Sequence, residues 1–362
     1  MTPRRHSVDF ADVEAQLRAL QRDGGEGELS FGRGKTLHVS SLGKTFFPDA
    51  GITKGDLMRY YTRVAPMLLP EIEGRALVLQ RHPDGVDGPM FFQQSAGEHV
   101  PDVVRVETLD TVDLGEKPRI IGGDLPTLLY TVQLGAIEVH PWLSRVNDIM
   151  APDRCLIDLD PGDDVPFSRV VALAREVVRI AEACGLTVAL KTSGASGIHI
   201  VLPLPPRTSY ETSAALALGL AGAVVAADPE HATLERGIKA RPKGSIYVDA
   251  LQNARGKSMA APYSVRAKPA APVSAPLRER ELTSRLRIET FTVKSMPARL
   301  TRTGDVWGDA IATRASARAL ARAMATLQDV SAASPPRRER TRRSRVGGTH
   351  AGPASRRRAR HA

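Results

Sequence analysis

Cysteine is scarce in this sequence, which contains only Cys155 and Cys184 among 362 residues. Two cysteines inside apolar segments exclude a disulfide framework and a cysteine-rich zinc site, and they fit a reducing cytoplasm. Aromatic residues are also scarce, at 4% of the chain with 8 phenylalanines. Two adjacent phenylalanines, as at Phe91 and Phe92, therefore need a specific reason.

A long hydrophobic run is missing as well. The longest uncharged apolar run, from Ala214 to Ala227, has fourteen residues, which is too short to cross a bilayer. We interpret it as a buried helix. The N-terminus carries Arg4 and Arg5 but no apolar stretch behind them, which excludes a secretory signal, and we expect no membrane partner.

The body of the chain has no excess of either charge. The formal net charge is +10, yet residues 335–362 alone hold ten arginines against one acid, Glu339. The remainder has 40 basic and 39 acidic residues. We predict that residues 329–362, rich in Arg, Pro, Gly and Ser, form a disordered tail. Arginine-rich arms of this kind bind polyanions with an affinity that falls steeply with salt, so nucleic acid is the natural partner.

What remains is a globular composition, with 42% hydrophobic and 25% charged residues. An amphipathic pattern predicts a first helix at about residues 8–22, and a glycine-rich break behind it indicates a separable helical leader, residues 1–30. Short β-rich runs then alternate with helical stretches, which predicts an α/β or α+β domain over residues 31–328. The expected strands are 76–80, 137–140, 156–160, 188–192, 198–202 and 246–249. One expected helix begins at Thr53. Three further helices are expected at residues 167–184, 210–227 and 309–329.

Two aspartates occupy alternate positions in the expected strand 156–160. Asp158 and Asp160 therefore point to the same face of a sheet, where their charges repel. A divalent cation with oxygen ligands, Mg²⁺ or Mn²⁺, would relieve that repulsion. The alternative is an ordinary strand end that enters a turn. Asp249 ends another expected strand, and a third carboxylate would complete the coordination of two ions for nucleotidyl transfer.

A loop rich in serine and glycine links two expected strands within residues 191–199. Glycines such as Gly194 let backbone N–H groups approach a phosphate, and Ser193 and His199 add side-chain donors. The segment is not a P-loop, because it lacks the Gly-Lys-Ser/Thr end and no helix follows. A plain hairpin loop is the alternative.

Three further basic side chains are candidates on weaker grounds. Lys257 and Arg266 follow Asp249 and carry charges suited to a triphosphate, although each can equally be a surface charge. His140 ends the expected strand 137–140, and a single strand-end histidine is more often structural than catalytic.

Taken in order, these segments resemble the polymerase domain of bacterial ligase D, which belongs to the archaeo-eukaryotic primase superfamily and serves non-homologous end joining. The resemblance covers about residues 31–328. It is carried by Glu138-Val139-His140-Pro141-Trp142, Ile157-Asp158-Leu159-Asp160-Pro161-Gly162, Lys191-Thr192-Ser193-Gly194, Gly197-Ile198-His199 and Val248-Asp249-Ala250-Leu251-Gln252-Asn253. It implies a primase-like fold, with mixed central β-sheets and an RRM-like catalytic module flanked by helices.

The resemblance also implies roles for the candidate residues. It implies that Asp158, Asp160 and Asp249 hold two catalytic ions, Mn²⁺ or Mg²⁺, with His140 near the reacting centre. The residues implied to contact the incoming nucleotide are Ser193, Gly194, His199, Lys257 and Arg266.

The N-terminal half carries the implied DNA contacts. Leu42-Gly43-Lys44 and Thr53-Lys54-Gly55-Asp56 resemble the family's opening motif, which implies that Lys44 and Lys54 contact the 5′-phosphate of a downstream strand. Phe91 and Phe92 resemble the aromatic pair that packs on bases at the gap. Buried core is the alternative for these rings, and one exposed and one buried ring is an equal expectation.

The function implied is a nucleotidyltransferase of non-homologous end joining that fills gaps at DNA ends, adding nucleotides, by resemblance ribonucleotides, to a 3′-hydroxyl. No Lys-x-Asp-Gly adenylation motif occurs, so we expect a stand-alone polymerase module. Its expected partners are DNA ends and gaps with a 5′-phosphate, nucleoside triphosphates, Ku and a separate ATP-dependent DNA ligase. The expected location is the cytoplasm, at the nucleoid. The alternatives are a primase-polymerase that starts chains de novo and a non-catalytic scaffold that binds DNA ends.

Overall fold

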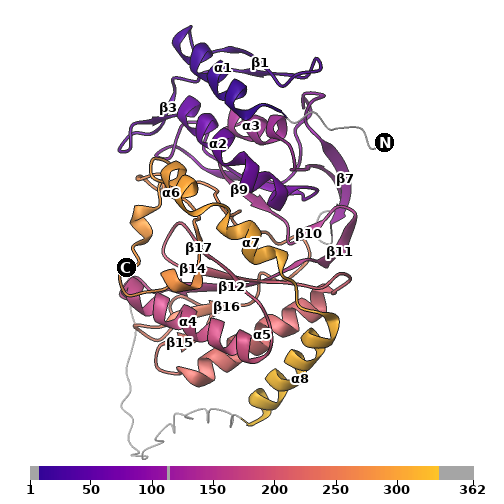
Figure 1. Ribbon diagram of the computed structural model, residues 1–362, viewed down its shortest axis with the longest axis vertical. Helices are drawn as coiled ribbons and strands as arrows, with labels where there is room; N and C mark the ends of the chain where they lie inside the picture. The colour runs from indigo at the N-terminus through magenta and orange to yellow at the C-terminus, as the bar shows by residue number, and fades with distance from the viewer. Residues whose placement is uncertain (1–7, 112–114, 334–362) are drawn as a thin grey trace, which may run out of the picture.

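The computed structural model describes residues 8–111 and 115–333, which form two packed lobes (Figure 1). The N-terminal lobe contains α1 (Phe10–Arg22), β1 (Gly27–Ser30), β2 (Thr36–Val39), β3 (Thr45–Phe47), β4 (Ile52–Thr53), α2 (Lys54–Ile72), β5 (Leu77–Arg81), β6 (Phe91–Gln93), β7 (Val106–Thr111), β8 (Gly115–Ile120), α3 (Leu125–Gln133) and β9 (Ala136–Pro141). Strands β6, β5 and β9 form a three-stranded sheet in that order. The pairs β1–β2, β3–β4 and β7–β8 form three small antiparallel hairpins.

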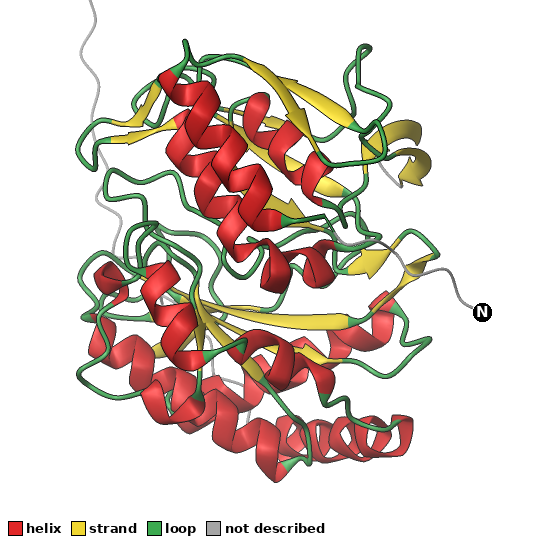
Figure 2. Cartoon of the chain, turned by 45° about the horizontal axis from the view of Figure 1, so that its top comes forward, coloured by secondary structure: helices red, strands yellow, loops and turns green. Residues whose placement is uncertain are grey.

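The second lobe is built on a six-stranded sheet. Its elements are β10 (Ser144–Arg145), β11 (Asp148–Pro152), β12 (Arg154–Pro161), α4 (Phe167–Ala183), β13 (Ala189–Thr192), β14 (Ile198–Pro203), α5 (Tyr210–Ala227), β15 (Ala232–Thr233), β16 (Ile246–Asp249), β17 (Pro276–Leu277), the 3-10 turns η1 (Glu279–Glu281) and η2 (Ile288–Thr290), α6 (Met296–Thr303), α7 (Val306–Ala312) and α8 (Ala317–Ala333). The strand order is β15-β16-β12-β14-β13-β17. Helices α4, α5 and α8 lie on the side of this sheet that faces away from the N-terminal lobe (Figure 1 and Figure 2).

Helix α1 lies directly on α2, within the same core. Its buried residues Val13 and Leu17 belong to the main hydrophobic cluster. Glu14 accepts a hydrogen bond from Arg63 of α2 at 3.0 Å. The predicted first helix is thus present and packed against the body, while the boundary at residue 30 stays a prediction. Thr53 caps α2 as expected, in a reciprocal capping box with Asp56.

The last predicted helix, 309–329, is wrong in its extent. The structure has two helices there, because α7 ends at Ala312, Thr313 is extended with φ −87° and ψ 106°, and α8 begins only at Ala317. Helix α8 also continues to Ala333, so the first residues of the predicted disordered tail are helical. The arginine-rich part of that tail, 334–362, lies outside the described residues.

Helix α5 is the one helix of the described ranges that is long and apolar enough to span a membrane, with a mean hydropathy of 1.4. The core helix of a globular protein meets the same criteria of length and composition. Here α5 packs against α4, α8 and β12, and Leu216, Leu220 and Val224 are buried. These contacts agree with the buried helix that the sequence predicts.

A buried ion-pair network joins α2 of the N-terminal lobe to the start of β12 in the second lobe. Glu71 of α2 is 3% exposed and accepts hydrogen bonds from Arg154 of β12 at 2.9 and 3.1 Å and from the Trp307 indole at 3.1 Å. Arg75 is equally buried and pairs with Asp153. Burial opposes ionisation of both carboxyls, but the surrounding guanidiniums prevail: the pKa of Glu71 is lowered and that of Asp153 falls to about 2.

We expect Arg154→Ala to destabilise the fold by about 3–5 kcal/mol, because it leaves the Glu71 carboxylate buried without its main partner. Chemical denaturation at pH 7 measures this loss, with Arg179→Ala, which breaks an exposed ion pair with Glu176, as the control without effect. The lowered pKa values mean that the network stabilises the protein above about pH 4 and loses this contribution as the pH falls towards 2. The difference in the free energy of unfolding between wild type and Arg154→Ala should therefore become smaller as the pH falls. A difference that does not change with pH would contradict the assignment of Glu71 and Asp153 as ionised partners of Arg154.

Candidate active site

Three aspartates share one face of the six-stranded sheet. Strand β12 lies between β14 and β16, with Asp158 opposite His199 on β14 and opposite Asp249 on β16. Directly opposed residues of neighbouring strands point to the same face, so these three side chains form a row across the sheet. Asp160 lies two positions further along β12 on that face. The alternation of Asp158 and Asp160 in the sequence predicts this placement.

The Asp158 carboxyl is the most strongly perturbed of the three. Burial, followed by the nearby charges of Asp160 and Asp249, raises its pKa to about 7. The Nε2 atom of His199 lies 3.4 Å from Asp158 Oδ1. The carboxyl therefore lies in a place where added positive charge would be favourable.

The other two carboxylates already have partners. Arg241 donates to Asp160 Oδ2 at 2.9 Å while its guanidinium lies 4.5 Å from the centre of the Tyr247 ring. Asp249 accepts from the Tyr247 hydroxyl at 3.2 Å and from the Leu251 backbone at 2.8 Å. Arg241 was not among the sequence candidates, although it lies in a basic loop just before β16.

The donor set fits a divalent metal. Carboxylate oxygens are the ligands that Mg²⁺ and Mn²⁺ prefer, and the crowded negative charge around Asp158 calls for a cation. In the described ranges, no group of three or more His, Cys, Asp or Glu side chains is arranged so that it could hold a metal ion. The assignment of Asp158, Asp160 and Asp249 as metal ligands therefore stays a prediction, and it requires the three side chains to come closer together than they are here.

A cavity of 260 Å³ opens beside the aspartates, between the two lobes. It is lined by His140, Leu156, Asp158, Leu159, Asp160, Ser193, Ala195, Ser196, Gly197, His199, Gln252, Ser258, Met259, Ala260 and Arg266. Most of the polar residues that the sequence singles out therefore meet here, including His140 from β9 of the N-terminal lobe.

The Ser/Gly-rich loop between β13 and β14 forms one wall of this cavity. Gly194 has φ +74°, and a Cβ there would lie 2.5 Å from the Arg266 side chain. A Cβ on Gly197 would lie 2.0 Å from the Leu159 carbonyl oxygen, so this position also requires glycine. The Ser193 hydroxyl accepts hydrogen bonds from the N–H groups of Ala195 and Gly197, which leaves its own O–H free to donate. Those two N–H groups are engaged within the loop rather than offered to a ligand.

A buried lysine contacts His199. Lys191 of β13 is 0% exposed, and its Nζ lies 2.6 Å from His199 Nδ1 and 2.8 Å from Ser274 Oγ. A lysine at this distance can donate to Nδ1, which favours the tautomer of His199 that carries its proton on Nε2, the nitrogen nearer to Asp158. Lys191 was missed as a site residue because a lysine in a strand gives no signal of what it contacts.

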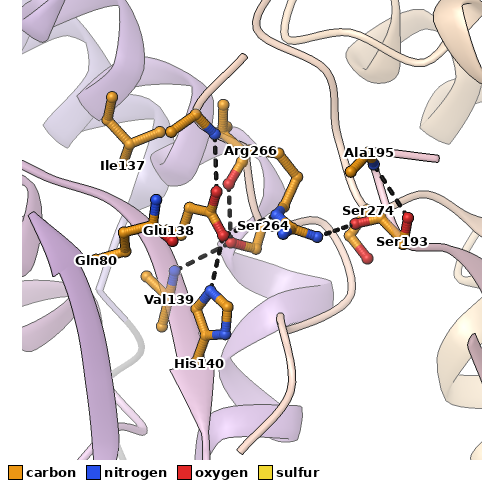
Figure 3. A network of polar contacts seen from close by, with 12 residues as sticks. Gln80, Ile137, Glu138, Val139, His140, Ser193, Ala195, Ser264, Arg266 and Ser274 are labelled. Carbon is orange, nitrogen blue, oxygen red and sulfur yellow. Dashed lines mark hydrogen bonds and ion pairs between the residues drawn. The ribbon is translucent and has the colours of Figure 1, made fainter. Parts of the chain in front are cut away.

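Glu138 contacts the other histidine of the cavity, His140 (Figure 3). Its carboxylate lies 2.8 Å from His140 Nε2 and accepts from Arg266 Nε at 2.7 Å. Arg266 also donates to the Ser193 carbonyl oxygen. Burial lowers the pKa of His140, so the ring is neutral. Glu138 was also missed from the sequence, which pointed only to His140 two positions later.

The remaining candidates lie outside the cavity. Lys257 is exposed, although the following residues Ser258 to Ala260 line the wall. Lys44 pairs with Asp84 at 2.7 Å. Lys54 is 5% exposed and donates to the Ser40 carbonyl oxygen; burial and the charge of Lys44 lower its pKa to about 8. These two lysines thus lie near each other at the start of α2.

Phe91 and Phe92 are both exposed, by 45% and 57%. They lie on β6, the edge strand of the three-stranded sheet, and Arg81 lies over the Phe91 ring at 5.0 Å. Neither the buried-core alternative nor the expectation of one buried ring holds.

The family model described as LigD, primase-polymerase domain, matches residues 53–307. The chain belongs to this family. The LigD primase-polymerase domain is a DNA-directed nucleotidyltransferase, and domains of this kind depend on metal ions. Every candidate site residue except Lys44 lies within the matched range.

Relatives and a solved structure agree with the LigD assignment. The multifunctional non-homologous end joining protein LigD of Pseudomonas aeruginosa is 32% identical over 281 residues, which cover 77% of this chain and 33% of the relative. The bifunctional LigD of Bacillus subtilis is 33% identical over 269 residues, covering 74% and 43%. This LigD-type chain thus spans about a third to two-fifths of their length.

The polymerase domain from Mycobacterium tuberculosis Ligase D in complex with DNA matches with a TM-score of 0.71 and 28% identity. The match covers 77% of this chain and 99% of that one. The primase-like α/β fold expected of a LigD polymerase domain is therefore confirmed.

Proposed function

We propose that this domain fills short gaps at DNA ends during non-homologous end joining, by adding nucleotides to a 3′-hydroxyl. The observation that carries the proposal is the convergence of Asp158, Asp160 and Asp249 on one sheet face beside a cavity lined by His140, His199 and Arg266. The names of the relatives, which are end-joining proteins, support the biological setting.

The two histidines can have opposite roles towards the substrates, His140 as a proton acceptor and His199 as a hydrogen-bond donor. His140 donates a hydrogen bond from Nε2–H to Glu138, so Nδ1 keeps a lone pair that can accept the proton of a 3′-hydroxyl. His199 gives its Nδ1 lone pair to Lys191, so Nε2–H can donate to a phosphate oxygen. Arg266 supplies further cationic donors for the triphosphate.

Two divalent ions held by the three aspartates would lower the pKa of the attacking hydroxyl and neutralise the leaving diphosphate. We propose Mn²⁺ or Mg²⁺, since both prefer carboxylate oxygens. The protein's own contribution is then mainly positioning and charge neutralisation.

The DNA side of the proposal rests on exposed aromatics and paired lysines. Two exposed phenyl faces on β6 can stack on any base, at about 1–3 kcal/mol each, which suits an enzyme indifferent to sequence. Lys54 is buried without an acidic partner among its hydrogen bonds, so a terminal phosphate would supply the charge it lacks. We further propose Ku and a separate ATP-dependent ligase as partners at chromosomal breaks in the cytoplasm.

The double variant Lys44→Ala/Lys54→Ala should remove most of the preference for 5′-phosphorylated gaps, because both cations near the start of α2 are lost. Incorporation on gaps with a 5′-hydroxyl should change less than about 2-fold, since neither lysine lines the catalytic cavity. Primer extension on matched phosphorylated and unphosphorylated gaps measures the ratio. A wild type that uses both gaps equally would refute this role.

The function itself is tested by primer extension on a 5′-phosphorylated gapped duplex with Mn²⁺ and either ribo- or deoxyribonucleotides. An unprimed template run beside it separates gap filling from initiation de novo. We expect extension of the primer, with ribonucleotides used better, and no product without a primer. Tight binding to DNA ends without incorporation would instead favour a scaffold.

A further inference from the structure

Glu138 has an unusual place in the molecule. It lies on β9 of the N-terminal lobe, yet its side chain, 4% exposed, is held by the second lobe at the wall of the cavity (Figure 3). One oxygen, Oε2, lies 2.8 Å from His140 Nε2 and 2.7 Å from Arg266 Nε, and the other accepts from the Ala267 backbone at 2.9 Å. Three contacts separated by up to 129 residues in sequence therefore converge on one carboxylate.

The first contact determines which nitrogen of His140 carries the proton. Burial opposes ionisation of Glu138, but the hydrogen bond from His140, the charge of Arg266 and the hydrogen bond from the Ala267 backbone prevail and lower its pKa to about 2. An ionised carboxylate can only accept, so His140 donates from Nε2 and keeps its lone pair on Nδ1. Without the carboxylate, nothing in this contact selects that tautomer.

The second contact orients Arg266. A guanidinium has five N–H donors. One is held by Glu138 and another by the Ser193 carbonyl oxygen, which fixes the plane of the group beside the Ser/Gly-rich loop. The remaining donors can then bind phosphate oxygens from a preset orientation, which lowers the entropy cost of binding.

We propose that Glu138 is a positioning residue of the nucleotidyl-transfer reaction, which sets the acceptor nitrogen of His140 and the guanidinium of Arg266 around the incoming triphosphate. The inference rests on the proposed function and deepens it. It differs from a role in stability alone, because both groups that Glu138 holds line the cavity.

Glu71 provides the matched control. Its carboxylate is also buried, at 3% exposed, and also joins the two lobes through arginine, in this case Arg154 of β12. Glu71 is not among the residues that line the cavity. Glu71→Gln should therefore report what the loss of a buried lobe-bridging charge does to stability at a position outside the cavity, where its effect on the site is a contribution to the pKa of Lys191 that is smaller than those of burial, Arg266 and Asp158.

The experiment compares Glu138→Gln, Glu138→Asp and Glu71→Gln with wild type. Three quantities are measured: the melting temperature, the affinity for a fluorescent nucleoside triphosphate without primer, and kcat/KM on gapped DNA. We expect Glu138→Gln to lose about 10- to 100-fold in kcat/KM, as a hydrogen bond to a charged group predicts, and to bind nucleotide more weakly. Glutamine keeps the size of the side chain, but its amide has one acceptor oxygen where the carboxylate has two, so it cannot accept from His140, Arg266 and the Ala267 N–H together.

Glu138→Asp keeps the charge on a shorter side chain, so it should recover part of both losses. Glu71→Gln should lower the melting temperature at least as much as Glu138→Gln while keeping nucleotide affinity and kcat/KM near wild type. The proposal is overturned if Glu138→Gln matches Glu71→Gln in all three measurements, or if nucleotide affinity falls equally in both. Nucleotide affinity keeps the test independent of turnover: an inactive wild type would count against the proposed function, while the binding comparison would still decide the role of Glu138.

Discussion

Asp158→Asn should lower nucleotide incorporation by at least about 1000-fold while leaving binding to gapped DNA within about 2-fold of wild type. Asp158 is the central side chain of the row across the sheet, with His199 of β14 as its neighbour on one side and Asp249 of β16 on the other. Asparagine keeps its shape but removes the charge that a divalent ion needs. The DNA contacts proposed above, at Lys44, Lys54, Phe91 and Phe92, do not involve Asp158, so the loss should fall on chemistry rather than on DNA affinity.

Thermal melting gives a second readout for this substitution. In metal-free protein Asp158→Asn should raise the melting temperature, because it removes one of three clustered carboxyl groups from a partly buried position. Added Mn²⁺ should stabilise wild type more than the variant, since the variant binds the ion less tightly. The control is Asp163→Asn, an exposed acid in the loop after β12, which should change neither activity nor the response to Mn²⁺. Extension by Asp158→Asn near the wild-type rate would remove the metal assignment.

The sequence predicts the sheet well where a strand is buried on both faces. Strand β16 is found at Ile246–Asp249 as expected, and β12, β13 and β14 differ from their predicted ranges by a few residues at most. Their runs of branched apolar residues leave little choice but a buried strand. Hairpin β7–β8 was not predicted, because residues such as Glu116 and Lys117 are exposed and give no hydrophobic alternation.

The candidate site could be predicted only in part. Asp158 and Asp160 are found from the period of a strand, which is local information. Lys191 faces His199 because β13 and β14 pair in one register, and Glu138 meets Arg266 across 128 residues of sequence. Such contacts depend on the tertiary arrangement of lobes, which local spacing does not encode. The exposure of Phe91 and Phe92 likewise follows from the edge position of β6 rather than from their own sequence.

Lys191→Met should reduce activity while it leaves stability unchanged or increases it. A folding defect would instead lower both. Lys191 is fully buried with no carboxylate among its hydrogen-bond partners, which are His199 and Ser274. Burial, and then the charge of Arg266, lowers its pKa to about 7, so the folded protein pays to keep the ammonium charged. Methionine fills a similar volume without that cost.

The loss of activity comes from His199. Without an ammonium at its Nδ1, the ring is free to place its proton on either nitrogen, and the Nε2–H donor towards the phosphate is no longer fixed. We expect kcat/KM for the nucleotide to fall about 10- to 100-fold, the value of one hydrogen bond to a charged group. Steady-state kinetics and chemical denaturation at pH 7 measure the two effects, with Lys117→Met on the exposed face of β8 as the control. Full activity in Lys191→Met would show that His199 is oriented by something else. A fall in activity that tracks a fall in stability would reduce Lys191 to a packing residue, because only a positioning role separates the two.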